Sequence, residues 1–154
     1  MIDADGCPVV NITVKASLEN NIRCILLCDT SHIFNIDGIE TITVSKGADS
    51  ADFRLVNLVE DGDLAITQDY GLAAMCLAKN AIVINQDGMR YTDENISGLL
   101  SIRHVNKKIR SSGGRVKGNE KRTKKQNDNF YETLSLIIKK NKFFSSYFSI
   151  DVES

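Results

Sequence analysis

The sequence contains little of what marks several large classes of protein. Its 154 residues include one proline, no tryptophan and only two histidines. No segment approaches the roughly 20 consecutive apolar residues that span a membrane as a helix, and the first residues lack the basic and apolar regions of a signal peptide. Hydrophobic residues make up 42% and charged residues 25% of the chain, which is ordinary for a globular protein. We therefore expect one soluble, cytoplasmic domain with a buried core.

Several catalytic and metal-binding motifs are also missing. The four cysteines form no C-x-x-C pair, and two histidines are too few to complete an obvious zinc set with them. The phosphate-binding sequence G-x-x-x-x-G-K-[ST] is absent, which argues against nucleotide hydrolysis of the P-loop type. We find no Ser/His/Asp set either. The cysteines, which we interpret as mainly buried thiols, are Cys7, Cys24, Cys28 and Cys76.

Positive charge is concentrated in one segment of a chain whose net charge is only −1. Residues 107–125 contain nine Lys and Arg side chains and a single acid, Glu120, so this segment carries +8 and the remainder −9. Its glycines and its lack of apolar periodicity predict a flexible loop over 107–126. A solvated connector is one interpretation, and attraction of a phosphate-rich partner such as RNA is the other. The candidate nucleic-acid-binding residues are Lys107, Lys108, Arg110, Arg115, Lys117, Lys121, Arg122, Lys124 and Lys125.

Apolar runs alternate with helical patterns along the chain, which predicts an α/β fold with a central, mainly parallel five-stranded sheet flanked by helices. The expected strands cover residues 1–4, 22–28, 40–44, 63–67 and 81–84. The expected helices cover about 8–20, 53–59, 70–79 and 93–106, with a last one over 127–142. We expect residues 1–106 to form the core of the domain, the helix over 127–142 to dock on it, and residues 143–154 to form a tail.

Aspartates follow four of the expected strands. Because the carboxyl ends of parallel strands meet at one edge of a sheet, we expect these acids to converge there. Carboxylates suit Mg²⁺ or Mn²⁺, which can activate water and screen a phosphodiester. Each acid taken alone is also explained as a helix cap or turn residue. The acids are Asp3 and Asp5 after the first strand, Asp29 after the second, Asp49 and Asp52 after the third, and Asp69 after the fourth.

Four segments make the chain similar to a known family of proteins. They are Asp3-Ala4-Asp5-Gly6-Cys7-Pro8-Val9, Gly47-Ala48-Asp49-Ser50-Ala51-Asp52, Gly62-Asp63-Leu64-Ala65-Ile66-Thr67-Gln68-Asp69, and Arg90-Tyr91-Thr92 with Asn95-Ile96. With these segments the chain resembles the uncharacterised YaiI/YqxD family, also called UPF0178 or DUF188, as far as about Leu134.

The resemblance implies a PIN-like, three-layer (Rossmann-like) fold, whose better-known members are metal-dependent nucleases. On that analogy Asp3, Asp52 and Asp69 would hold Mg²⁺ or Mn²⁺, and Asp5 would join them as a catalytic residue. The analogy further implies a supporting role for Asp49, Asp63 and Thr67. The prediction is thus a metal-dependent nuclease, with RNA favoured over DNA as the substrate.

The sequence departs from the family pattern at two places. The family's Thr-Gly-Gly-Pro loop falls on Val116-Lys117-Gly118-Asn119, and its Asp-Arg pair falls on Gln126-Asn127. In addition, only Met1 and Ile2 precede Asp3, so the first strand is expected to be short. Two alternatives stay open: a haloacid-dehalogenase-type phosphatase with Asp3 as nucleophile and Asp5 as general acid, and a non-catalytic RNA-binding protein that acts through residues 107–125.

Overall fold

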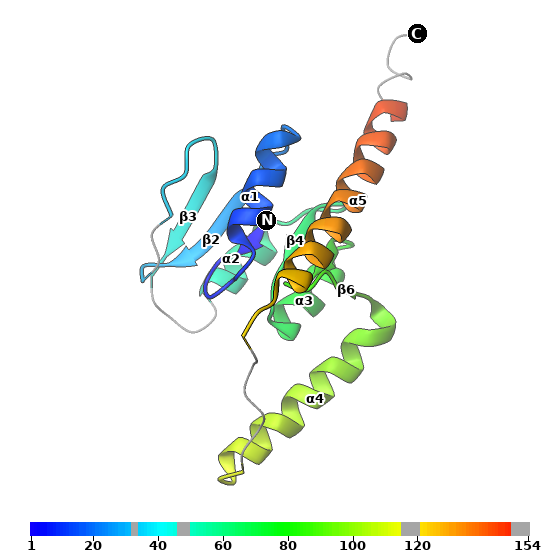
Figure 1. Ribbon diagram of the computed structural model, residues 1–154. Helices are drawn as coiled ribbons and strands as arrows, with labels where there is room; N and C mark the ends of the chain where they lie inside the picture. The colour runs from blue at the N-terminus through cyan, green and yellow to red at the C-terminus, as the bar shows by residue number, and fades with distance from the viewer. Residues whose placement is uncertain (32–33, 46–49, 115–120, 149–154) are drawn as a thin grey trace.

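Strands and helices alternate along the chain as the sequence predicts. The computed structural model describes residues 1–31, 34–45, 50–114 and 121–148 (Figure 1). The strands are β1 (Ile2–Asp3), β2 (Ile25–Asp29), β3 (Glu40–Val44), β4 (Leu64–Ile66), β5 (Ile82–Ile84) and β6 (Arg90–Tyr91). The helices are α1 (Val10–Glu19), α2 (Ser50–Leu58), α3 (Tyr70–Leu77), α4 (Asp93–Ser111) and α5 (Lys124–Phe148). In the ranges described, no helix is long and apolar enough to cross a bilayer.

The strands form one sheet in the order β3-β2-β1-β4-β5-β6. All neighbouring pairs are parallel except β5 and β6. The sheet therefore has six strands rather than the predicted five, because β6 adds an antiparallel edge. Along the chain, β2 and β3 are added on one side of β1, and β4, β5 and β6 are then added on its other side. Sheets of this kind bind ligands beyond the carboxyl ends of the strands at such a reversal, which here lies between β1 and β4.

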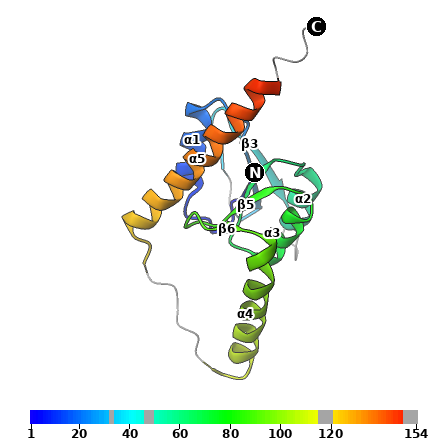
Figure 2. The same cartoon turned by 90° about the vertical axis from the view of Figure 1, so that its right-hand side faces the viewer.

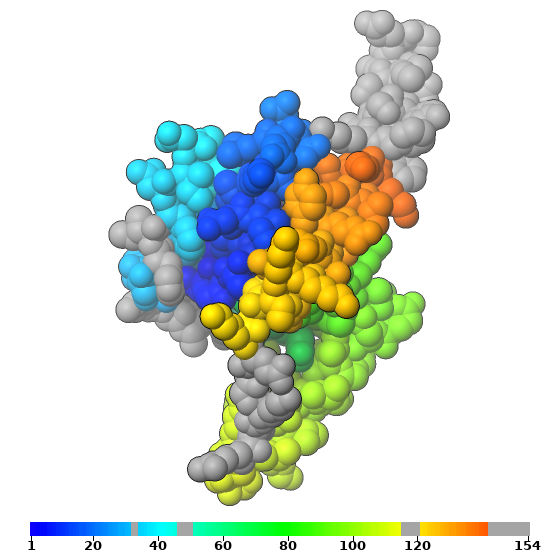
Figure 3. Space-filling view, viewed as in Figure 1, coloured from blue at the N-terminus to red at the C-terminus, as the bar shows by residue number. Residues whose placement is uncertain are grey.

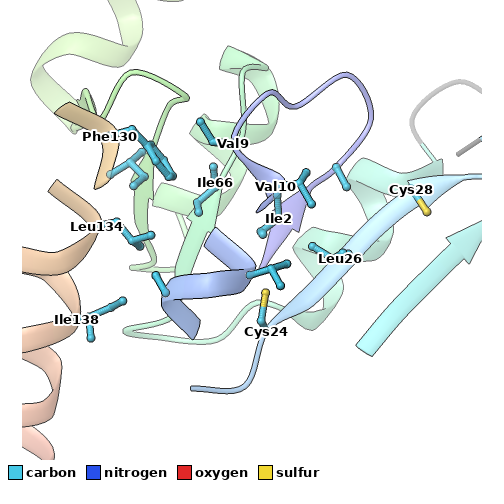
Figure 4. Packing of buried hydrophobic residues seen from close by; sticks show 14 residues of the cluster. Ile2, Val9, Val10, Cys24, Leu26, Cys28, Ile66, Phe130, Leu134 and Ile138 are labelled. Carbon is cyan, nitrogen blue, oxygen red and sulfur yellow. The ribbon is translucent and has the colours of Figure 1, made fainter. Parts of the chain in front are cut away.

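The sheet is buried on both faces, because alternate side chains of its strands enter two separate cores. On β2, Leu26 and Cys28 pack with α1 and α5, whereas Ile25 and Leu27 pack with α2 and α3. Figure 2 shows these two pairs of helices on opposite sides of the sheet. Figure 4 shows the first core, in which Ile2 and Leu26 of the sheet lie near side chains of α1 and α5. The three layers confirm the predicted fold class.

The two long helices extend further than their apolar patterns predict. Helix α4 was expected to end near residue 106 but continues to Ser111, so Lys107, Lys108 and Arg110 are helical rather than part of a loop. Helix α5 begins at Lys124 and includes Lys125. Figure 1 shows the second half of α4 leaving the body of the domain, where its side chains are largely exposed. Of the predicted loop over 107–126, residues 115–120 lie outside the described part of the chain.

Candidate functional site

Asp3 occupies the centre of the site, at the carboxyl end of the central strand β1. Its strand neighbour Ile2 packs into the core beneath α1 and α5. Because side chains alternate along a strand, Asp3 faces the opposite side of the sheet, where α2 and α3 begin. β1 lies between β2 and β4, with Ile2 opposite Leu26 and Ile66. The sheet order thus places the Asp3 carboxylate at the reversal between β1 and β4.

Thr67 connects Asp3 to the end of β4. Its side chain is fully buried, and its hydroxyl donates a hydrogen bond of 2.9 Å to Asp3 Oδ2. The same Oγ1 accepts a bond of 3.0 Å from the backbone N–H of Asp69. The hydroxyl therefore fixes the Asp3 carboxylate and the start of α3 in one arrangement. The structure thus brings Thr67 into contact with Asp3, and its supporting role stays a prediction.

Three further carboxylates act on Asp3. Burial raises the pKa of the Asp3 carboxyl from its ordinary 3.8 to about 6, and the charges of Asp52, Asp5 and Asp69 raise it in the same direction. The Thr67 hydrogen bond opposes this rise by stabilising the ionised form. Asp5, Asp52 and Asp69 therefore lie close enough to Asp3 to act on its charge, as expected from their positions after the strands.

Asp5 and Asp52 approach Asp3 from two different elements. Asp5 Oδ2 accepts a hydrogen bond of 2.9 Å from the backbone N–H of Asp29, at the end of β2. This bond ties the loop after β1 to the neighbouring strand. Asp52 lies in the first turn of α2, where the helix dipole stabilises a negative charge.

Asp69 lies at the same edge, but its carboxylate is engaged by two other groups. Oδ1 accepts the backbone N–H groups of Gly71 and Leu72 at 2.7 and 3.0 Å and so caps α3. Arg103 of α4 also binds both carboxylate oxygens, with Nη1–Oδ1 at 3.0 Å and Nη2–Oδ2 at 2.9 Å. Such a bidentate pair competes with a metal ion for the same lone pairs. The structure therefore does not support Asp69 as a ready metal ligand.

Arg103 cannot be recognised from the sequence alone, because no helical pattern says which basic residue of α4 meets the start of α3. Its guanidinium offsets one of the negative charges at this edge, because it forms an ion pair with Asp69.

One of the supporting acids, Asp63, lies away from this edge, and another falls outside the described residues. Asp63 precedes β4 and lies at the amino end of that strand, where its Oδ2 accepts a 2.9 Å bond from the N–H of Glu60. Asp63 is a turn residue at the opposite edge of the sheet from Asp3. We therefore correct the prediction that Asp63 supports the site. Asp49 lies outside the described residues.

The predicted basic set divides into separate groups. Lys107, Lys108 and Arg110 lie on the exposed end of α4, and Lys121, Lys124 and Lys125 are exposed around the start of α5. Arg122 differs from them, because its guanidinium is largely buried and donates to Asp87 Oδ1 at 2.7 Å, to the Gln86 carbonyl and to Asn127 Oδ1. We therefore correct its role from nucleic-acid contact to structural ion pair. Arg115 and Lys117 fall outside the described residues.

The donor chemistry of this edge fits a hard divalent cation. Within the ranges that the structure describes, no three Asp, Glu, His or Cys side chains are arranged to hold a metal ion together. Mg²⁺, however, is often held by only one or two carboxylates, with water and substrate phosphate as its other ligands. Asp3 and Asp52 repel each other across this edge, and a cation between them would relieve that repulsion.

Replacing Thr67 with Val is expected to raise the pKa of Asp3 above 6 and to cost about 1–2 kcal/mol of folding free energy. The change keeps the shape of the side chain but removes both hydrogen bonds of the hydroxyl. An NMR titration of the Asp3 carboxyl and urea unfolding would measure the two effects. Thr13→Val is the matched control, because Thr13 is buried and its hydroxyl bonds only to Val9 O within the described residues. An unchanged Asp3 pKa in Thr67→Val would contradict the assigned role of Thr67.

Comparison with known proteins identifies the family. The sequence profile described as "Uncharacterized BCR, YaiI/YqxD family" matches residues 1–140. A UPF0178 protein of Exiguobacterium sibiricum is 47% identical over 137 residues, which are 89% of this chain and 94% of that protein. A UPF0178 protein of Ruminiclostridium cellulolyticum is 48% identical over 140 residues, covering 90% of this chain and 91% of the relative. No solved structure matches the chain, so the likeness to PIN-like nucleases stays a prediction. The chain belongs to the uncharacterised YaiI/YqxD (UPF0178) family.

Proposed function

We propose that this protein is a Mg²⁺- or Mn²⁺-dependent nuclease that hydrolyses phosphodiester bonds of RNA at the edge formed by β1 and β4. The observation that supports this most is the position of Asp3. It lies at the reversal in strand order, is partly buried, and is surrounded by the charges of Asp52, Asp5 and Asp69. A buried carboxylate among like charges destabilises the fold, so a function is the simplest reason for it.

Asp3 and Asp52 would hold the metal ion. When bound, the ion would lower the pKa of a coordinated water and stabilise negative charge on the phosphate. Thr67 keeps the Asp3 carboxylate oriented, and Asp5 adds negative charge beside it. Asp69 keeps its place as the cap of α3, with Arg103 as its counter-ion.

RNA is the substrate class that the surrounding surface favours. The exposed end of α4 and the segment around the start of α5 carry six of the predicted Lys and Arg side chains, not counting Arg122. Such charges bind a phosphate backbone without regard to sequence, with an affinity that falls as salt rises. Stacking aromatics are sparse near them, so a sequence-tolerant mode of binding is expected.

The test measures Mn²⁺ binding by calorimetry and cleavage of a short single-stranded RNA in the presence of Mn²⁺. Asp52→Asn is expected to weaken Mn²⁺ binding at least about tenfold and to lose most of the cleavage, because it removes one of two ligands. Asp61→Asn is the matched control, since it removes the same charge from an exposed turn away from the sheet edge. Equal Mn²⁺ affinity in both variants, or cleavage that persists in EDTA, would refute the proposal.

The same assays separate the two alternative functions. A haloacid-dehalogenase-type phosphatase would hydrolyse the monoester p-nitrophenyl phosphate and leave RNA intact. A non-catalytic RNA-binding protein would retain its RNA affinity in EDTA and in Asp52→Asn, and would cleave neither substrate. Either result would replace the proposed nuclease function with the corresponding alternative.

A further inference from the structure

A polar hollow of about 470 Å³ lies beside the acidic edge. Its floor is formed where β1, β4 and β5 end, by Gly6 and Pro8, Gln68, and Gln86 with Asp87. The segment that leads into α5 supplies the remaining wall. Figure 3 shows this start of α5, in yellow, against the N-terminal segment, in blue. The wall residues are Lys121, Arg122, Thr123 and Gln126.

The hollow and the acidic cluster share the same reversal in strand order but occupy opposite sides of it. Asp52 in α2 and Asp69 at the cap of α3 lie on one face of the sheet, whereas the hollow is lined by residues that lead into α1 and α5 on the other. Gln68 and Gly6 separate them, joined by a hydrogen bond of 3.2 Å from Gln68 Nε2 to the Gly6 carbonyl. Gln68 is also the residue between Thr67 and Asp69. A ligand in the hollow would therefore be next to the carboxylates.

Side-chain hydrogen bonds fix the residues that form the wall of the hollow. Arg122 ties it to the turn after β5 through Asp87 and the Gln86 carbonyl. Thr123 and Gln126 form reciprocal bonds at the start of α5, with Thr123 N to Gln126 Oε1 at 2.8 Å and Gln126 N to Thr123 Oγ1 at 3.3 Å. These hydrogen bonds hold the lining in place before any ligand arrives. They therefore lower the conformational entropy that is lost on binding.

We propose that this hollow binds the nucleotide that adjoins the scissile phosphate of the substrate strand, with Lys121 contacting its phosphate. The inference rests on the proposed nuclease function for the identity of the strand. Its chemistry comes from the lining: amide groups of Gln68, Gln86 and Gln126 can donate to and accept from a base edge, and the Lys121 ammonium attracts a phosphate. The volume is in the range of pockets that hold small molecules.

The experiment uses uridine 5′-monophosphate, with uridine and inorganic phosphate as separate probes, in EDTA so that no cleavage takes part. We expect the nucleotide to shift the backbone NMR signals of Gln68, Gln86 and Thr123, and to bind more tightly than either probe alone. Lys121→Gln is expected to weaken its binding about fivefold, as the loss of one exposed charge contact. Lys139→Gln, which removes the same charge from an exposed residue of α5 outside the lining, should have no comparable effect.

Failure of the inference and failure of the function give different results. No shifts at the lining residues, or equal weakening by Lys121→Gln and Lys139→Gln, would overturn the nucleotide site even in an active nuclease. Nucleotide binding in the hollow of a protein that cleaves no RNA with Mn²⁺ would instead refute the nuclease and leave the binding site established.

Discussion

Replacing Asp3 with Asn is expected to abolish RNA cleavage and, at neutral pH, to make the metal-free fold more stable. The cleavage should fall by at least about 100-fold, because the change removes a proposed metal ligand at the centre of the site. The gain in stability has a separate cause. Asn has nearly the same shape and can still accept the Thr67 hydrogen bond, but it carries no charge to desolvate beside Asp52, Asp5 and Asp69.

The pH dependence of this gain follows from the direction of the pKa shift. The Asp3 pKa rises from 3.8 to about 6 on folding, so the folded state holds this proton more tightly than the unfolded state. Below about pH 4 the carboxyl is neutral in both states and costs nothing. Between about pH 4 and pH 6 the unfolded state releases this proton while the folded state retains it, so stability falls by roughly 3 kcal/mol at most and changes little above pH 6. Asp3→Asn should therefore gain about 1–3 kcal/mol at pH 7.5 and almost nothing at pH 4.

Urea unfolding of both proteins at the two pH values, in EDTA, measures this difference. Asp61→Asn again serves as the control, because an exposed turn residue should change stability little at either pH. A loss of stability in Asp3→Asn at pH 7.5 would show that the ionised Asp3 carboxylate does not destabilise the folded state. Retained cleavage would remove Asp3 from the site.

The parts of the fold that the sequence predicts are those governed by apolar patterns. The run from Ile22 to Cys28 was assigned to a strand buried on both faces, and β2 has side chains in both cores. Strand β6 was missed because two residues are too few to show any alternation. It forms because Asn85 Oδ1 accepts the N–H groups of Asp87 and Met89 and turns the chain back onto β5.

The end of α4 was placed too early for a related reason. Beyond residue 106 the helix has few apolar contacts with the body, so no apolar pattern marks it. Lys and Arg, however, are good helix formers and need no buried partner to continue a helix.

The site was predictable to the extent that it depends on strand order. Acids that follow parallel strands must share one edge, and Asp3, Asp5, Asp52 and Asp69 do so. The sequence does not indicate which side chains from distant elements pair with each other. The contact of Arg103 with Asp69 joins α4 to α3 across 34 residues, and it changes the predicted metal set from three aspartates to two.

Replacing Arg122 with Met is expected to destabilise the fold by about 2–4 kcal/mol, although sequence analysis grouped this residue with exposed phosphate-binding cations. The Arg122 side chain is only 19% exposed, and that of its partner Asp87 is 36% exposed. Removing the guanidinium leaves Asp87, the Gln86 carbonyl and Asn127 without their donor in a partly dry environment, which costs more than the pair itself contributes.

The position of the ion pair increases its effect, because it holds α5 against the turn after β5. The turn after β5 passes so close to α5 that a Cβ at Gly88 would lie 2.8 Å from Thr133 Oγ1. Gly88 also has a positive φ of 82°. Loss of Arg122 should therefore loosen the docking of α5, whose Phe130 is fully buried in the first core.

The matched control is Arg23→Met. Arg23 and Glu40 form an ion pair with the same N–O distance of 2.7 Å, but their side chains are 76% and 45% exposed. Because water replaces the lost partner at such a site, this change should cost much less stability than the loss of Arg122. Urea unfolding of both variants compares the two pairs directly. Equal losses would mean that burial does not set the strength of the Arg122 pair, and a negligible loss in Arg122→Met would return that residue to the group of cations available for RNA.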